Sequence, residues 1–141
     1  MEGQKLNQAA ELIVHSSHNT GFTGAGISVE SGIPPFRGEN GLWSKYDPGI
    51  LDLSYFYSHP EKAWPVIKEI FYEFFGSARP NAAHKALAEL EKMGLLNSVI
   101  TQNIDNLHQE AGNTEVYEFH GNSRYLVCQK CDERFEVNEE F

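Results

Sequence analysis

Two glycines and a serine form the first group of residues that could do chemistry. Gly24 and Gly26 follow a short stretch that reads as a strand, and Ser28 comes two residues later. A glycine-rich turn in this position lets backbone N–H groups approach a diphosphate closely, as dinucleotide binding requires. Val29 stands where the usual fingerprint has a third glycine. The turn alone is therefore weak evidence, and a serine that caps a helix is the alternative interpretation of Ser28.

A second polar group follows an apolar, β-branched stretch, Ser98–Thr101, that predicts a buried strand. Gln102, Asn103 and Asp105 come directly after it. Burying such side chains is costly unless each has a hydrogen-bond partner. A ligand with amide and hydroxyl groups would supply those partners, and an ordinary polar turn is the alternative.

One histidine occupies a position suited to acid–base chemistry. His120 follows a predicted strand at residues 116–119 and precedes Gly121, which exposes its imidazole to a cleft. An imidazole titrates near neutral pH, so it can take a proton from a hydroxyl group. The remaining histidines are expected at the surface, in helix caps or in the core: His15, His18, His59, His84 and His108.

The two cysteines, Cys128 and Cys131, lie three residues apart. This spacing provides two thiolates of a tetrahedral zinc site, which needs four ligands. A second pair would be expected about 15–20 residues further on, and the sequence ends at Phe141. A redox-active dithiol is the alternative, although such dithiols usually stand at the start of a helix.

Taken in order, four blocks resemble the motifs of the sirtuins, the NAD-dependent protein-lysine deacylases. They are residues 23–37, 101–108, 119–121 and 128–131, within a match from about residue 9 to residue 135. Pro35 departs from the pattern, since many sirtuins have Asp or Asn there. The resemblance implies that the following residues bind NAD: Gly24, Ala25, Gly26, Ser28, Ile33, Phe36, Arg37, Gln102, Asn103, Ile104, Asp105 and His120.

The resemblance also implies roles. His120 and Asn103 are the expected catalytic residues, with His120 as the base that activates a ribose hydroxyl. Asp105 meets the nicotinamide carboxamide, Phe36 covers the nicotinamide pocket and Arg37 helps to position the cofactor loop. NAD is consumed as the acyl group of an acyl-lysine protein or peptide is transferred to its ribose. The products are free lysine, nicotinamide and acylated ADP-ribose, and Cys128 and Cys131 hold half of a structural zinc site.

Hydrophobic periodicity predicts the elements that position these groups. We expect an amphipathic helix around residues 6–14, a strand at Thr20–Thr23 and a loop at 38–53. A broad apolar helical face covers residues 60–75, and a second helix runs from Asn81 to Met93 with Ala83, Leu87 and Leu90 buried. Strands that alternate with helices predict an α/β fold with a partial, Rossmann-like open parallel sheet. Two short strands, at residues 125–128 and 135–137, flank the cysteines and predict a small zinc-ribbon-like segment.

We therefore expect an NAD-binding portion over residues 1–122, with a helical insertion near 54–93. The start of a small zinc-binding module follows at 123–141. The net charge of −9 and the absence of a basic run argue against direct nucleic-acid binding. The sequence has no signal-like segment and no membrane span, so we expect a soluble, cytoplasmic protein.

The function predicted from this resemblance is NAD-dependent deacylation, most simply deacetylation, with this chain as the N-terminal portion of the enzyme. Two other hypotheses remain open. One is a non-catalytic module that binds NAD or ADP-ribose. The other is an interaction protein in which two chains share a zinc ion through their cysteine pairs.

Overall fold

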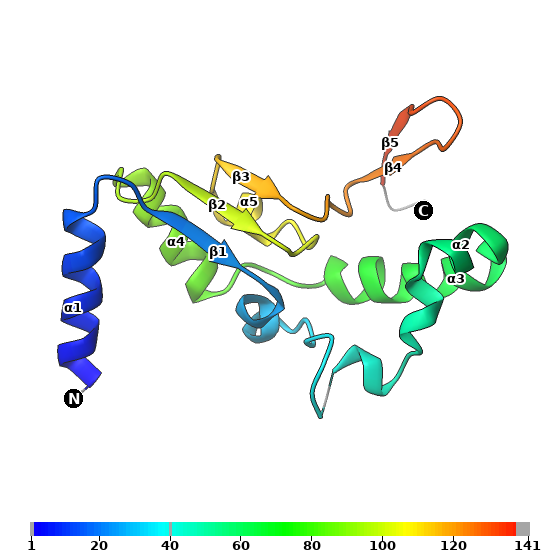
Figure 1. The fold of residues 1–141 in the computed structure, drawn as a ribbon, viewed down its shortest axis with the longest axis horizontal. Coiled ribbons are helices and arrows are strands. Elements are labelled where there is room, and N and C mark those ends of the chain that lie inside the picture. The colour runs from blue at the N-terminus through cyan, green and yellow to red at the C-terminus, as the bar shows by residue number, and fades with distance from the viewer. Residues whose placement is uncertain (1, 40, 138–141) are drawn as a thin grey trace.

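A computed structural model describes residues 2–39 and 41–137. Its centre is a parallel sheet of three strands in the order β1–β2–β3 (Figure 1). The strands are β1 (Thr20–Thr23), β2 (Ser98–Thr101) and β3 (Val116–Glu118). The prediction of a parallel α/β sheet is confirmed, and β3 ends one residue earlier than expected. Because all three strands run the same way, the residues that follow them meet at one edge of the sheet.

Two helices pack on one face of this sheet, namely α4 (Ala82–Lys92) and α5 (Leu107–Ala111). Gly21 of β1 lies where an added Cβ would contact the side chains of Val99, Leu87 and Leu96, so this face is closely packed. Asn81 caps α4 as predicted, accepting hydrogen bonds from the Ala83 and His84 amides. The prediction that Ala83 is buried was wrong, because Ala83 is exposed and His84 is fully buried.

The predicted N-terminal helix is present as α1 (Glu2–His15). It lies at one end of the molecule, apart from the other helices (Figure 1), and Leu6, Leu12 and Val14 are exposed. Its connection to the sheet is fixed by Asn19, whose side-chain amide donates to the backbone oxygens of Ile13 and Leu95.

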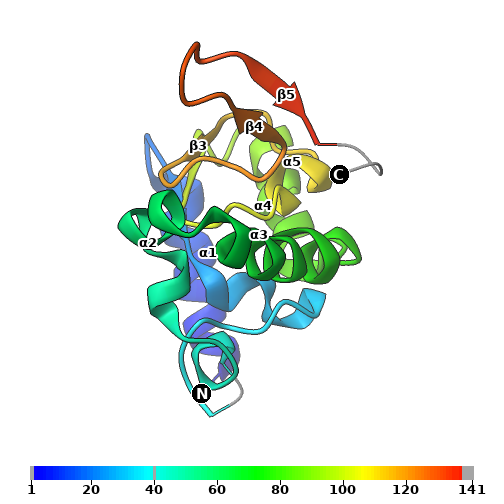
Figure 2. The same cartoon turned by 90° about the vertical axis from the view of Figure 1, so that its right-hand side faces the viewer.

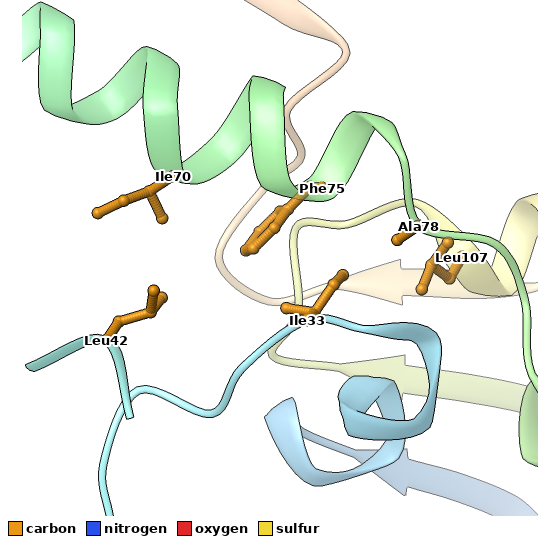
Figure 3. Packing of buried hydrophobic residues seen from close by; sticks show 6 residues of the cluster. All are labelled: Ile33, Leu42, Ile70, Phe75, Ala78 and Leu107. Carbon is orange, nitrogen blue, oxygen red and sulfur yellow. The ribbon is translucent and has the colours of Figure 1, made fainter. Parts of the chain in front are cut away.

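The helical insertion begins within the segment that we expected to be a loop. It contains the 3₁₀ turns η2 (Leu42–Ser44) and η3 (Pro48–Leu51), followed by α2 (Leu53–Ser58) and α3 (Pro60–Lys68). The helix then continues as a π-helix, η4 (Glu69–Phe74). Its apolar face packs on the segment after η1 (Ala25–Ser31), so Ile70 and Phe75 face Leu42 and Ile33 (Figure 3).

An antiparallel ribbon of β4 (Tyr125–Val127) and β5 (Arg134–Glu136) completes the described chain. It forms an arm beyond the end of β3 (Figure 1) and lies at the top of the view in Figure 2. The two predicted strands around the cysteines are thus confirmed, with boundaries one residue shorter or shifted. None of the described helices is both long and apolar enough to cross a membrane.

Candidate active site

A cavity of about 640 Å³ opens at the carboxyl edge of the sheet. Three segments converge on it, one after each strand of the sheet, and the helical insertion closes its other side. The lining residues are Ala25, Ser28, Ile33, Pro34, Phe36, Trp43, Pro48, Gly49, Leu51, Asp52, Phe71, Phe75, Gln102, Asn103, Ile104, Asp105 and His120. A cavity of this size, with polar groups gathered on one wall, is typical of a cofactor or substrate site.

The polar wall is a connected network. Ser28 is fully buried, and its hydroxyl donates to Asp105 Oδ2 over 2.6 Å. The Asn103 side-chain amide donates to Ser28 Oγ over 3.1 Å and to the Gly24 carbonyl oxygen over 3.2 Å. Asp105 Oδ1 accepts from the Leu107 backbone N–H. These groups satisfy one another before any ligand arrives, so the wall is preorganised.

His120 stands at the rim of the same cavity with its side chain exposed. Its Nδ1 lies 3.0 Å from the Gln102 carbonyl oxygen. A carbonyl oxygen can only accept a hydrogen bond, so the proton of the neutral ring belongs on Nδ1. Nε2 then carries a free lone pair, which is the state that a general base requires.

The apolar wall is built around the segment that follows η1. Phe36 and Trp43 pack with ring centroids 5.2 Å apart. Their backbones are paired as well, because the Trp43 N–H donates to the Phe36 carbonyl oxygen over 3.0 Å. Phe71 and Phe75, one turn apart on the helical insertion, close this side of the cavity. The cavity thus joins a hydrogen-bonding wall to an aromatic wall.

Two buried histidines lie behind the polar wall. The rings of His84 and His108 have centroids 4.9 Å apart, and neither side chain is exposed beyond 1%. His108 Nε2 bonds to the Thr23 hydroxyl over 2.8 Å. Burial lowers the pKa of both rings below the ordinary histidine value, and the nearby Asp105 carboxylate opposes this shift. Both histidines are therefore neutral core residues at physiological pH.

Comparison with known proteins agrees with this geometry. The model of the Sir2 family matches residues 24–141. The chain belongs to the Sir2 family. It is 45% identical over 135 residues to the NAD-dependent protein deacetylase 1 of Pyrobaculum aerophilum, and 49% identical over 136 residues to the NAD-dependent protein deacylase 2 of Archaeoglobus fulgidus. Each match covers 96% of this chain and 53% of the relative.

Solved structures show that the fold is shared too. A Sir2 structure with a deacetylated p53 peptide and 3′-O-acetyl ADP-ribose matches with a TM-score of 0.88 at 44% identity. A complex of a Sir2 homologue with ADP-ribose matches with a TM-score of 0.86 at 43% identity. The matches cover 94% and 92% of this chain, and 53% and 52% of the solved chains. The Sir2-family chain described here thus spans about half the length of the relatives it matches.

Most residues that the sequence singled out in this Sir2-family chain do meet at the cavity. Three predicted cofactor residues, Gly24, Gly26 and Arg37, do not line it. Gly24 contributes through its carbonyl oxygen to Asn103, whereas Arg37 is exposed. Sequence reasoning did not assign Trp43, Leu51, Asp52, Phe71 and Phe75 to the site. Of these, only the i, i+4 spacing of Phe71 and Phe75 in an apolar helix was a usable signal.

The cysteines of the Sir2-family chain form a tight turn at the tip of the ribbon. The Asp132 N–H donates to the Cys128 carbonyl oxygen over 3.0 Å, and the Cys128 N–H donates to the Glu133 carbonyl oxygen over 2.9 Å. Backbone N–H groups of Lys130 and Cys131 face the Cys128 thiol and lower its pKa. This favours the thiolate that zinc needs, but no cluster of three or more metal-ligand side chains exists among the described residues.

Proposed function

We propose that this chain carries the NAD site and the catalytic base of an NAD-dependent protein-lysine deacylase, with acetyl-lysine as the preferred substrate. The observation that carries the proposal is the convergence of Ser28, Asn103, Asp105 and His120 on one cavity. When bound, NAD supplies the nicotinamide leaving group and the ribose that receives the acyl group. The relatives of this chain are named for NAD-dependent deacetylation and deacylation, which supports this assignment.

Different residues of the chain bind different parts of NAD in this proposal. The turn at Gly24, Ala25 and Gly26 holds the diphosphate, since the two glycines on either side of the cavity residue Ala25 have no side chain to block the approach to the backbone. Asn103 and Asp105 recognise polar groups of the ribose and nicotinamide, and Ser28 holds Asp105 in place through the 2.6 Å hydrogen bond. The Asp105 carboxylate still has lone pairs free to accept from an amide.

His120 acts as the general base in this proposal. The Gln102 carbonyl oxygen holds its Nδ1–H, so Nε2 can take the proton of a ribose hydroxyl as that hydroxyl attacks the acyl carbon. The aromatic side chains of Phe36 and Trp43 exclude water from the opposite wall, which protects the transferred group from hydrolysis. Ile33 and Ile104 complete this apolar lining.

The test is a mass-spectrometric assay with an acetyl-lysine peptide and NAD. We expect nicotinamide and acetylated ADP-ribose to form in equal amounts. The His120→Ala variant should lose at least ~10²-fold in turnover, which is the usual contribution of a general base, while NAD binding by calorimetry is largely retained. NAD binding without turnover in the unmodified protein would instead favour a non-catalytic binding module.

We also propose that the segment from residue 123 onward is the start of a zinc-binding module, separate from an NAD-binding portion at residues 1–122. Cys128 and Cys131 would supply two of the four thiolates that a structural zinc site needs. Metal analysis combined with size-exclusion chromatography tests this. We expect less than one zinc per chain, or one zinc shared by two chains, and loss of zinc in Cys131→Ser. No zinc at any ratio would contradict the module, and one tightly held zinc per monomeric chain would contradict the expectation that the two cysteines form only half of a site.

A further inference from the structure

Glu118, the last residue of β3, holds the turn that carries His120. Its side chain is only 16% exposed, although it is a carboxylate. Oε1 accepts from Gln109 Nε2 over 2.7 Å and from the Arg124 guanidinium over 3.2 Å, and Oε2 accepts from Asn122 Nδ2 over 2.6 Å. One carboxylate thus joins three segments: α5, the end of β3 and the chain after the turn.

The far side of the same turn is fixed to the polar wall of the cavity. Ser123 donates to the Ile104 carbonyl oxygen from both its N–H, over 3.1 Å, and its hydroxyl, over 2.8 Å. The Asn106 side-chain amide donates to Ser123 Oγ over 3.0 Å. Residues 119–121 therefore form a short arch between Glu118 and residues 122–124, and His120 lies within it.

The His120 side chain is exposed. Its ring centroid lies 5.4 Å from that of Phe119, and its Nδ1 lies 3.0 Å from the Gln102 carbonyl oxygen. The backbone on either side is held as well, because the Phe119 N–H donates to the Thr101 carbonyl oxygen over 2.9 Å and the Gly121 N–H to the Glu118 carbonyl oxygen over 3.1 Å. Gly121 adopts a φ of 80°, in the left-handed region that favours glycine, so the arch has a defined backbone shape. The side-chain anchors that set its position belong to Glu118 on one side and to Ser123 on the other.

We propose that Glu118 is a positioning residue for His120, and that its carboxylate keeps the imidazole in the Nδ1–H tautomer with Nε2 directed to the substrate. The proposal rests on the proposed function for its catalytic meaning, but the orientation of His120 can be measured without turnover. Without the carboxylate, Asn122 and Gln109 lose their acceptor and the Arg124 charge loses its partner. The arch then moves relative to Gln102, and the bond that selects the tautomer is lost.

The first test is nuclear magnetic resonance of the histidine ring nitrogens in the unliganded chain. We expect the Nδ1–H pattern for His120 in the unmodified protein and in Glu118→Gln, whose amide oxygen still accepts. In Glu118→Ala we expect this pattern to be replaced by the Nε2–H form or by a mixture. Glu115→Ala, which removes an exposed carboxylate three residues earlier, is the matched control and should leave the pattern unchanged.

The second test separates positioning from general stability. Asn122→Ala removes two side-chain hydrogen bonds of the arch, one donated to Glu118 Oε2 and one accepted from the Arg124 N–H, and leaves the Glu118–Arg124 pair, so it serves even if Glu118→Ala does not fold. In the active enzyme we expect Glu118→Ala to lower kcat about 10- to 100-fold through misplacement of the base, with KM for NAD nearly unchanged. An unchanged His120 ring pattern in folded Glu118→Ala and in Asn122→Ala would overturn the proposal. If neither the unmodified protein nor any variant shows turnover, the proposed function is wrong. The measurement of the His120 ring nitrogens then still decides whether Glu118 positions His120.

Discussion

In the proposed deacylase, the charged side chains around the cavity would determine which acyl groups it accepts. Asp52 and Asp105 line it beside His120, and no Lys or Arg lines it within residues 2–39 and 41–137. Arg79 is the first arginine after the helical insertion. Its guanidinium donates instead to the carbonyl oxygens of Gly76 and Ala78. An acyl group with a terminal carboxylate would therefore meet like charge and, among the described lining residues, no Lys or Arg.

The expected result is a preference for neutral acyl groups. Comparing acetyl- and succinyl-lysine versions of one peptide should give a much lower kcat/KM for succinyl, since a buried carboxylate without a partner costs several kcal/mol. Asp52→Asn is an informative companion variant, because removing one negative charge should narrow the difference without reversing it. A higher kcat/KM for the succinyl peptide would show that a cation reaches the cavity after all.

The buried histidine pair makes stability depend on pH. His84 and His108 stay neutral in the folded protein because burial lowers the pKa of each ring, whereas both rings titrate near pH 6.5 when the chain unfolds. Below that pH the unfolded state binds more protons, so stability falls as the pH falls. The loss should approach about 1.4 kcal/mol per pH unit for each histidine.

Urea unfolding at pH 7.5, 6.5 and 5.5 measures this dependence, in a range where carboxylates scarcely titrate. His84→Gln should reduce the change of unfolding free energy with pH. His15→Gln, at the exposed end of α1, should leave that pH dependence unchanged. Equal stability at pH 7.5 and 5.5 would mean that the pair takes up protons in the folded state.

Single residues were only partly predictable from the sequence. The positions of Asn103, Asp105 and His120 after strands predicted that they would meet, and the structure brings them to one cavity. For His84 the sequence left surface, helix cap and core open, and the structure buries its side chain, which completes a capping box at a place usually taken by Glu or Gln. Glu118 was missed because its role depends on Gln109, Asn122 and Arg124, and their proximity follows from the fold.

At the scale of elements, the loop that carries Phe36 depends on a close approach between backbones. An added Cβ at Gly41 would lie 2.7 Å from the Arg37 carbonyl carbon and 2.8 Å from the Phe36 carbonyl oxygen. Backbone atoms at such distances can yield only if the loop moves. Because the Leu42 and Trp43 N–H groups donate to Pro35 and Phe36, that movement would break the pairing which shapes the aromatic wall.

Gly41→Ala should therefore destabilise the protein by about 1–3 kcal/mol, the usual cost of overpacking, and should weaken NAD binding. Thermal unfolding and calorimetric titration with NAD measure the two effects. Gly76→Ala is the matched control, because an added Cβ there has no atom within 4 Å, and its stability should be unchanged or slightly raised. If Gly41→Ala and Gly76→Ala have the same stability and the same affinity for NAD, the loop accommodates the added methyl group without cost and the prediction is wrong.

Elements with a strong local pattern were predicted well, and those determined by tertiary packing were not. The strands β1 and β2 have the expected ends, and Asn81 begins α4 as its cap. The turns η2 and η3 were expected as a loop, because short 3₁₀ segments leave no periodicity. The π-helical end of the insertion also has no sequence signature of its own, although it places Phe71 beside the cavity.

At the scale of the whole molecule, helices within residues 2–39 and 41–137 cover only one face of the parallel sheet. On the other face Phe22, Ile100 and Tyr117 lie in one row across the three strands. Phe22 is 70% and Tyr117 59% exposed, and Phe119, just beyond β3, is 75% exposed. Parallel sheets are normally covered on both faces, and an exposed apolar patch of this kind favours association.

The chain should accordingly self-associate in solution through this face. Sedimentation velocity over a wide range of concentrations, in a buffer with a chelator so that no shared zinc can link two chains, should show reversible oligomers. The double variant Phe22→Lys and Tyr117→Lys should be monomeric, because charges on both edge strands oppose pairing of the two faces. Leu53→Lys, which replaces an equally exposed apolar residue (69%) at the start of α2, should associate like the unmodified chain. If the unmodified chain is a monomer at every concentration, the aromatic row is tolerated in water and the prediction is wrong. If Leu53→Lys is monomeric as well, association is not specific to the sheet face.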